Sequence, residues 1–167
     1  MLYKGRYLYR FNINMIITLE GFVLPTRYII KELTILYESG AFQHFHFNAP
    51  TDFMPTEKEM QTIKYTTKYL NQLNLHDESI LPYSTLDVIL KTVATRTIYV
   101  AGNAARKFLT AKLPTTCIID ISKKYGFKYA AALPRMSCFK VHTSRYCSLS
   151  KGMYIRNFLN SNVNIYV

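Results

Sequence analysis

The sequence has no long apolar run and few cysteines, and each shortage excludes a class of protein. The longest apolar run near the start, residues 15–19, ends at Glu20, whereas a membrane span needs about 18 residues and a signal-peptide core about 7. We therefore expect a protein of the cytosol or the nucleus without a membrane span. Three cysteines in 167 residues are too few, and of the wrong parity, for a disulfide framework.

Charged residues are also scarce, at 19% of the chain against 49% hydrophobic and 14% aromatic residues. This composition is the reverse of the one that keeps chains disordered, and 167 residues suffice for one domain with a closed core. No stretch is rich enough in glycine, serine or proline to form a linker. We expect a single domain over residues 14–167, preceded by a basic amino-terminal arm over residues 1–13.

Acidic residues are scarcer than basic ones: ten Asp and Glu stand against 21 Lys and Arg, a net charge of +11. A field of this sign attracts polyanions, and nucleic acid is the commonest such partner of a basic domain. Anionic membrane surfaces and acidic proteins are the competing partners. A further explanation is an A+T-rich coding sequence, which would enrich lysine together with Phe, Tyr, Met, Ile and Asn without any selection for binding.

Apolar periodicity and turn residues predict three antiparallel strands followed by alternating helices and strands. Strands are predicted over residues 14–19, 28–37, 42–47, 95–101 and 115–119, and helices over residues 55–75, 84–93, 104–112 and 146–159. Phe42 is out of phase with Phe45 and Phe47, which predicts a bulge in the third strand. His44 and His46 share one face of that strand, a spacing suited to a metal ion or, alternatively, to a partly exposed strand.

Three short motifs occur in this order. They are Thr18-Leu19-Glu20 before a Gly-x-x-Leu-Pro turn, residues 98–109 with Gly102-Asn103 at the start of a helix, and Ile118-Ile119-Asp120. Together they resemble the RNase H-like fold and, in detail, its DEDDh 3′-5′ exonuclease branch, over about residues 14 to 160. The resemblance implies an α/β fold with an RNase H-like mixed sheet. The same motifs are similar to proteins of insect genomes and insect viruses, a likeness that implies no activity.

Catalysis in that family implies about four carboxylates around two divalent metal ions. Glu20 stands in place of one of them. The other places are taken by residues without a carboxylate: Thr18, Ala105 or Arg106, and Lys151 or its neighbours. The resemblance therefore implies a catalytically degenerate domain without a cofactor, in which Glu20 is a surviving site residue or, alternatively, a hydrated or ion-paired residue at a strand end.

An active metal-dependent 3′-5′ exonuclease with displaced residues is the alternative, and it would use magnesium or manganese. Its catalytic residues would be Glu20, Asp87, Asp120 and His142. His142 stands in the region where the resemblance implies a catalytic histidine, although residues 147–152 contain no carboxylate.

The spacing Cys138-x3-His142-x4-Cys147 is close to a zinc-knuckle series and predicts a structural zinc ion. Cys117 would be the fourth ligand if its strand and this segment approach each other. The alternative is that the thiols are buried and act as small apolar groups.

Basic and aromatic residues alternate in two segments, residues 3–10 and 123–129. Arg and Lys can hold phosphates while Tyr rings stack on unpaired bases; a mobile arm and a loop that fills the core are the alternatives. We expect single-stranded DNA or RNA as the partner and no membrane. The expected phosphate contacts are Lys4, Arg6, Arg10, Arg106, Lys107, Lys123, Lys124 and Lys128, and the expected stacking residues are Tyr7, Tyr125 and Tyr129. A module that binds an acidic protein on the same scaffold is the last alternative.

Overall fold

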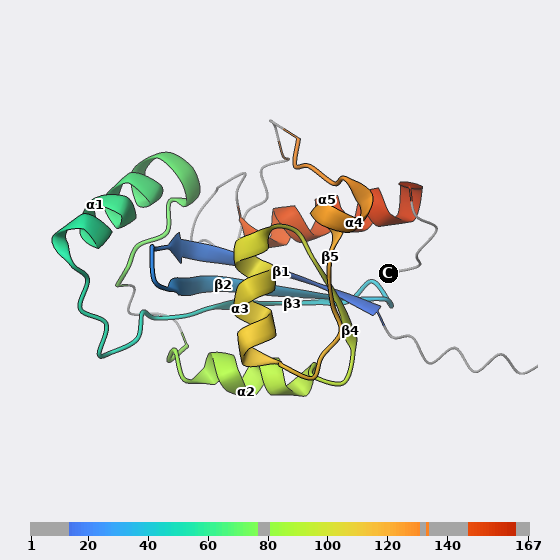
Figure 1. Cartoon of the computed structure of the whole chain (residues 1–167), viewed down its shortest axis with the longest axis horizontal. Helices are drawn as coiled ribbons and strands as arrows, with labels where there is room; N and C mark the ends of the chain where they lie inside the picture. Colours follow the sequence, from blue (N-terminus) through green and yellow to red (C-terminus); the bar gives the residue numbers. More distant parts are fainter. Residues whose placement is uncertain (1–13, 77–80, 131–132, 134–146, 163–167) are drawn as a thin grey trace, which may run out of the picture.

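The computed structural model describes residues 14–76, 81–130, 133 and 147–162, which form an α/β fold around one mixed sheet (Figure 1). The strands are β1 (Asn14–Val23), β2 (Tyr28–Tyr37), β3 (Phe42–His46), β4 (Thr97–Val100) and β5 (Ile118–Asp120). The helices are α1 (Glu57–Thr66) with the π-helical turn η1 (Thr67–Asn71), α2 (Thr85–Thr92), α3 (Asn103–Lys112), α4 (Ile121–Tyr125) and α5 (Ser148–Asn162). Within these described residues, no helix combines the length and apolar character needed to span a bilayer.

The five strands lie in the order β3-β2-β1-β4-β5. β1, β2 and β3 pair antiparallel through short connections, whereas β1 with β4 and β4 with β5 pair parallel. Parallel neighbours need a crossover connection, and α3 supplies one between β4 and β5. The prediction of an α/β fold with a mixed sheet is therefore confirmed.

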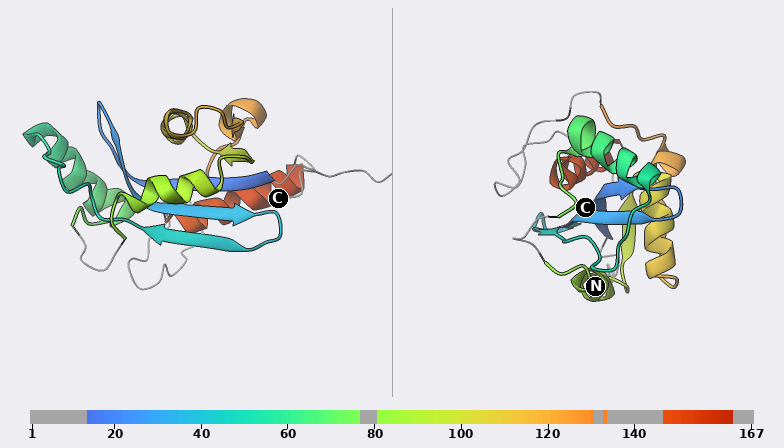
Figure 2. Two further views of the ribbon diagram at one scale, coloured as in Figure 1. Left: turned by 90° about the horizontal axis from the view of Figure 1, so that it is seen from below. Right: turned by 90° about the vertical axis from the view of Figure 1, so that its left-hand side faces the viewer.

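Helices cover both faces of the sheet, which Figure 2 shows between α5 and α2. On one face Ile16 and Leu36 pack with α4 and α5. On the other face Met15 and Ile35 pack with α2 and α3. Alternate residues of β1 and β2 thus enter opposite cores, which explains why these strands read as continuous apolar runs.

The prediction of a bulge in the third strand is wrong. β3 pairs residue for residue with β2, from Phe42 opposite Leu36 to His46 opposite Glu32. Phe42 is 40% exposed at the end of the sheet. Its side chain therefore need not lie on the same face as those of Phe45 and Phe47, and no bulge is required. The irregularity lies instead between β1 and β2. Glu20 pairs with Glu32 but Gly21 pairs with Ile30, so Lys31 is an extra residue of β2 at a bulge.

α1 begins at a capping box, in which Thr56 accepts from the amide of Glu59 and the Glu59 carboxylate accepts from the amide of Thr56. Apolar spacing predicts one buried face that includes Tyr69 and Leu70, but these side chains are 59% and 42% exposed. They lie in the π-helical turn, which contains an extra residue and rotates the following side chains off the buried face.

α4 falls in a segment for which the sequence predicts no helix. Asp120 caps its first turn and Gly126 ends it with φ +68°. A helix of five residues is too short to show a helical apolar period, so only its two caps mark it in the sequence.

Candidate functional site

Polar side chains lie side by side across three strands, on the face of the sheet that α5 covers. They form two rows in register, which we call the polar rows: Thr18, Thr34 and His44 in one, and Glu20, Glu32 and His46 in the other. Four of the six are buried and the other two are half-buried. Polar groups at such sites need hydrogen-bond or ionic partners, and the first residues of α5 supply them.

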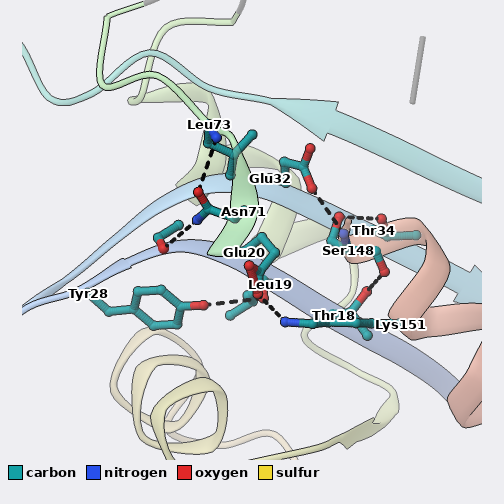
Figure 3. Close-up of polar contacts among 11 residues, drawn as sticks. Thr18, Leu19, Glu20, Tyr28, Glu32, Thr34, Asn71, Leu73, Ser148 and Lys151 are labelled. Atoms are coloured by element: carbon teal, nitrogen blue, oxygen red, sulfur yellow. Dashed lines mark hydrogen bonds and ion pairs between the residues drawn. The ribbon is translucent and has the colours of Figure 1, made fainter. Parts of the chain in front are cut away.

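Ser148, the first residue of α5, bonds to both rows (Figure 3). Its amide donates to Glu32 Oε2 at 3.0 Å and its carbonyl accepts from Thr18 Oγ1 at 2.6 Å. Its hydroxyl lies 2.8 Å from Thr34 Oγ1, which in turn lies 2.6 Å from His44 Nδ1. One residue of α5 thus holds all three strands of the meander in place.

Small residues let α5 approach the sheet this closely. A Cβ atom on Gly152 would overlap Leu36 Cδ1 and would lie 3.4 Å from Thr18 Oγ1. Glycine at this position therefore brings the helix onto the polar rows, and with it Lys151.

Lys151 forms an ion pair with Glu20 (Figure 3), and the two side chains are only 17% and 12% exposed. Burial raises the pKa of the Glu20 carboxyl, the Lys151 charge opposes this rise, and the neighbouring Glu32 adds to it. The ion-paired alternative for Glu20 is thus the one that the structure contains. A cation at this distance also opposes the approach of a metal ion to the same carboxylate.

Three neighbouring cavities share Tyr28 in their walls, and we call them the Tyr28 cavities. The first, of 210 Å³, is bounded by Glu20, Lys151, Tyr129 and residues 101–105. The second, of 410 Å³, includes Arg27, Lys107 and Phe108, and the third, of 330 Å³, extends towards Thr66 and Leu70. β1 pairs with β4 only over residues 14–16, so the rest of β1 has this open space beside it.

Tyr28 and Tyr129 border the Tyr28 cavities with aromatic rings. The Tyr28 hydroxyl donates to the Leu19 carbonyl at 3.2 Å, and its ring meets Phe108 edge-on at 5.9 Å. Burial first, and then the charge of Glu20, raise the pKa of both tyrosines. Both phenols therefore stay neutral and can donate hydrogen bonds at physiological pH.

The predicted catalytic residues that the structure describes each have a separate protein partner, which for Glu20 is Lys151. Asp87 lies on α2, on the other face of the sheet from Glu20, and pairs with Lys112 at 2.8 Å. Asp120 accepts from the amides of Ser122 and Gly102 at 3.0 and 3.3 Å. His142 lies outside the described residues.

Replacing Asp120 by alanine tests whether this carboxylate serves the fold. The loss of a helix cap and of a second amide bond is expected to lower the free energy of unfolding by about 1 to 2 kcal/mol, measured by chemical denaturation. Asp52→Ala, at an exposed turn residue, is the control and should change stability by less than about 0.5 kcal/mol. Equal stability of the two variants would contradict the capping role.

The predicted nucleic-acid contacts are spread over several elements. Arg106 and Lys107 lie on α3, Lys123, Lys124 and Tyr125 on α4, and Lys128 and Tyr129 after it. Of these, Lys107 and Tyr129 border the Tyr28 cavities. Tyr125 and Tyr129 also pack against the core under α4 and α5, as the alternative for this segment predicts. Lys4, Arg6, Tyr7 and Arg10 lie outside the described residues.

The cysteines predicted to bind zinc are not brought together where the structure describes them. Exposed Cys117 precedes β5, level with the start of β1. Buried Cys147 precedes Ser148, which lies over Thr18. Cys138, like His142, falls outside the described residues. In the described part of the chain, the cluster with metal-ligand spacing is instead Glu32, His44 and His46.

Sequence reasoning missed Glu32 and Ser148, and it considered Lys151 only as a lost acid. Glu32 has a signal in the sequence, since polar residues at the even positions of β1, β2 and β3 share one face of adjacent strands, whereas Ser148 and Lys151 on α5 have none. The chain matches no protein-family model and no curated protein. The family resemblance of its motifs therefore stays a prediction.

Proposed function

We propose that this chain is a catalytically degenerate exonuclease-like domain that binds single-stranded nucleic acid beside Tyr28. The observation that carries the proposal is the Glu20–Lys151 ion pair at the edge of the first Tyr28 cavity. It leaves a polar, aromatic-lined recess in which a carboxylate is already neutralised by the protein's own cation.

The arrangement of strands supports the resemblance on which the proposal depends. Three antiparallel strands precede two parallel ones, and Thr18 and Glu20 point to the same face of β1. α5 brings Lys151 to Glu20, and Lys151 or a neighbour stands where the resemblance implies the last acid. Residues of the first two motifs, Thr18-Leu19-Glu20 and Gly102-Asn103, thus border one cavity together with Lys151.

Two features argue against hydrolysis at this place. Among the described residues that border the 210 Å³ cavity, Glu20 is the one acidic side chain, whereas a two-metal site needs several carboxylates. The nearby Glu32 carboxylate is turned to the Ser148 amide and to His46. The site therefore fits binding better than metal-dependent cleavage.

Charge and ring chemistry support a single-stranded partner. Lys107 is exposed beside Phe108 in the 410 Å³ cavity, a volume within the range of small-molecule sites. In this proposal a base packs against the Tyr28–Phe108 ring pair while Lys107 and Arg27 hold phosphates. The net charge of +11 would draw the strand to this surface.

The test is a mobility-shift and cleavage assay with end-labelled single-stranded DNA and RNA in Mn²⁺. Retardation without shortening is expected. With about six phosphates contacted, raising the salt from 50 to 200 mM should weaken binding about 300-fold, because each contact releases condensed counterions. Binding that is indifferent to salt would contradict the proposal.

Matched variants locate the surface and separate the alternatives. The Arg106→Ala/Lys107→Ala chain should lower the slope of log affinity against log salt by about 1.4, whereas Lys58→Ala, exposed on α1, should leave it unchanged. Shortening that Glu20→Gln abolishes would establish the active exonuclease instead. No affinity at moderate salt would favour a module for an acidic protein.

A further inference from the structure

Glu32, His44 and His46 bring one carboxylate and two imidazoles together where β2 meets β3. One ligand atom from each residue lies within 4.8 Å of the others. The two histidines are alternate residues of β3, so their side chains share a face, and their ring centres are 4.6 Å apart. Glu32 stands directly opposite His46 in the register.

The spacing of donors fits an ion between them. Glu32 Oε1 lies 3.5 Å from His46 Nδ1, which is long for a hydrogen bond. Two ligands of a tetrahedral zinc ion, each about 2.0 Å from the metal, are separated by about 3.3 Å. A small movement of either side chain therefore gives both atoms ligand distances to one ion.

Neighbouring residues already orient two of the three ligands. Thr34 Oγ1 lies 2.6 Å from His44 Nδ1, and the Ser148 amide donates to Glu32 Oε2 at 3.0 Å. Metal-binding histidines usually hold their second ring nitrogen in such a bond, which fixes the ring and the tautomer. By this pattern, Nε2 of His44 and Oε1 of Glu32 are the atoms turned to the ion.

We propose that Glu32, His44 and His46 bind one Zn²⁺ ion that fastens edge strand β3 to β2 under the first turn of α5. Two imidazoles and a carboxylate are ligands that zinc accepts, with water or another donor in the fourth position. Glu32 is fully buried, and a divalent cation compensates its charge. This site adjoins the Glu20–Lys151 pair, since Glu32 lies opposite Glu20, but it uses other ligands and does not depend on nucleic-acid binding.

The test is a Zn²⁺ titration of the full chain after treatment with a chelator, followed by calorimetry and metal analysis. One ion per chain is expected. Zinc at 100 times its dissociation constant should raise Tm by about 5 to 10 °C. His44→Gln should weaken binding by more than about 10-fold, because loss of a ligand costs no less than loss of an orienting residue. His44 is half-buried, so this variant disturbs the core less than changes at Glu32 or His46.

His76→Gln is the matched control, since His76 is exposed and belongs to no cluster of metal ligands among the described residues. It should bind zinc as the wild type does, and equal Tm values of the two zinc-free variants would show that both fold. Zinc binding that persists in His44→Gln overturns the proposal, and its loss in Cys138→Ser would then assign the ion to the thiols. A wild-type chain that binds no zinc overturns it as well.

Discussion

Replacing Gly21 by alanine is expected to prevent stable folding, with a loss of more than about 4 kcal/mol in the free energy of unfolding. A Cβ atom at this position would overlap the Ile29 carbonyl oxygen and would lie 2.9 Å from the Lys31 amide nitrogen. Both atoms belong to the backbone of β2, so they cannot move aside without opening the β1–β2 ladder. Circular dichroism and urea denaturation of the purified chain measure the loss.

Gly40→Ala is the control for this prediction. Gly40 has φ +90°, but an added Cβ would meet no atom within 4 Å. Its replacement should cost about 1 kcal/mol, the usual penalty for a left-handed backbone carrying a side chain. If Gly21→Ala is as stable as Gly40→Ala, the close approach at the bulge does not limit stability.

Breaking the Glu20–Lys151 pair from one side is the second large effect. Lys151→Met keeps most of the length of the side chain but removes its charge, and it leaves Glu20 as a poorly exposed carboxylate near Glu32. We expect a loss of about 3 kcal/mol at pH 7, because the remaining charge has lost its partner. The Glu20→Gln/Lys151→Met chain removes both charges and should recover to within about 1 kcal/mol of the wild type.

The free energy of unfolding of the single and double variants should depend differently on pH. In the unfolded chain Glu20 loses its proton near pH 4.5, whereas burial raises the pKa of this carboxyl in the fold. Lys151→Met removes the charge that opposes the rise, so the folded variant binds its proton up to a still higher pH. Its free energy of unfolding should fall as pH rises above 4.5. The double variant should lack this slope, and additive losses in urea denaturation would contradict the coupling.

Strand positions and sheet class could be predicted because the chemistry that determines them is local. β-branched and aromatic runs mark β1 and β2, and turn residues separate them. Glu20 is recognisable as a charge directly after the apolar run of residues 15–19, although β1 continues to Val23. These features need no knowledge of the rest of the chain.

The residue of β2 that lies opposite Glu20 could not be predicted, because the bulge shifts the register. The turn pairs Val23 with Tyr28, and this register, continued without interruption, would set Glu20 opposite Lys31. The additional residue in β2 instead brings Glu32 opposite Glu20 and sends the Lys31 ammonium to the Leu75 carbonyl, 2.9 Å away. The Lys31 ammonium thus finds its acceptor 44 positions away, and neither strand sequence contains this partner.

The residues of α5 that cover the polar rows are also distant from them in sequence. Ser148 bonds to Glu32 across 116 positions, and Lys151 reaches Glu20 across 131. Nothing in the composition of α5 marks those two residues as partners of strand residues. Only the close approach at Gly152, seen in the fold, brings them to the sheet.

Those separations in sequence become delays when the protein is made. At about 5 to 20 residues per second, Glu20 and Glu32 leave the ribosome about 6 to 26 seconds before the residues of α5 that neutralise or bond to them. During that interval the carboxylates keep their water, and Ile16 and Leu36 on the same face have no helix to cover them. The three nascent strands therefore expose an apolar face that can aggregate. Protection by a chaperone matters most until α5 has been synthesised.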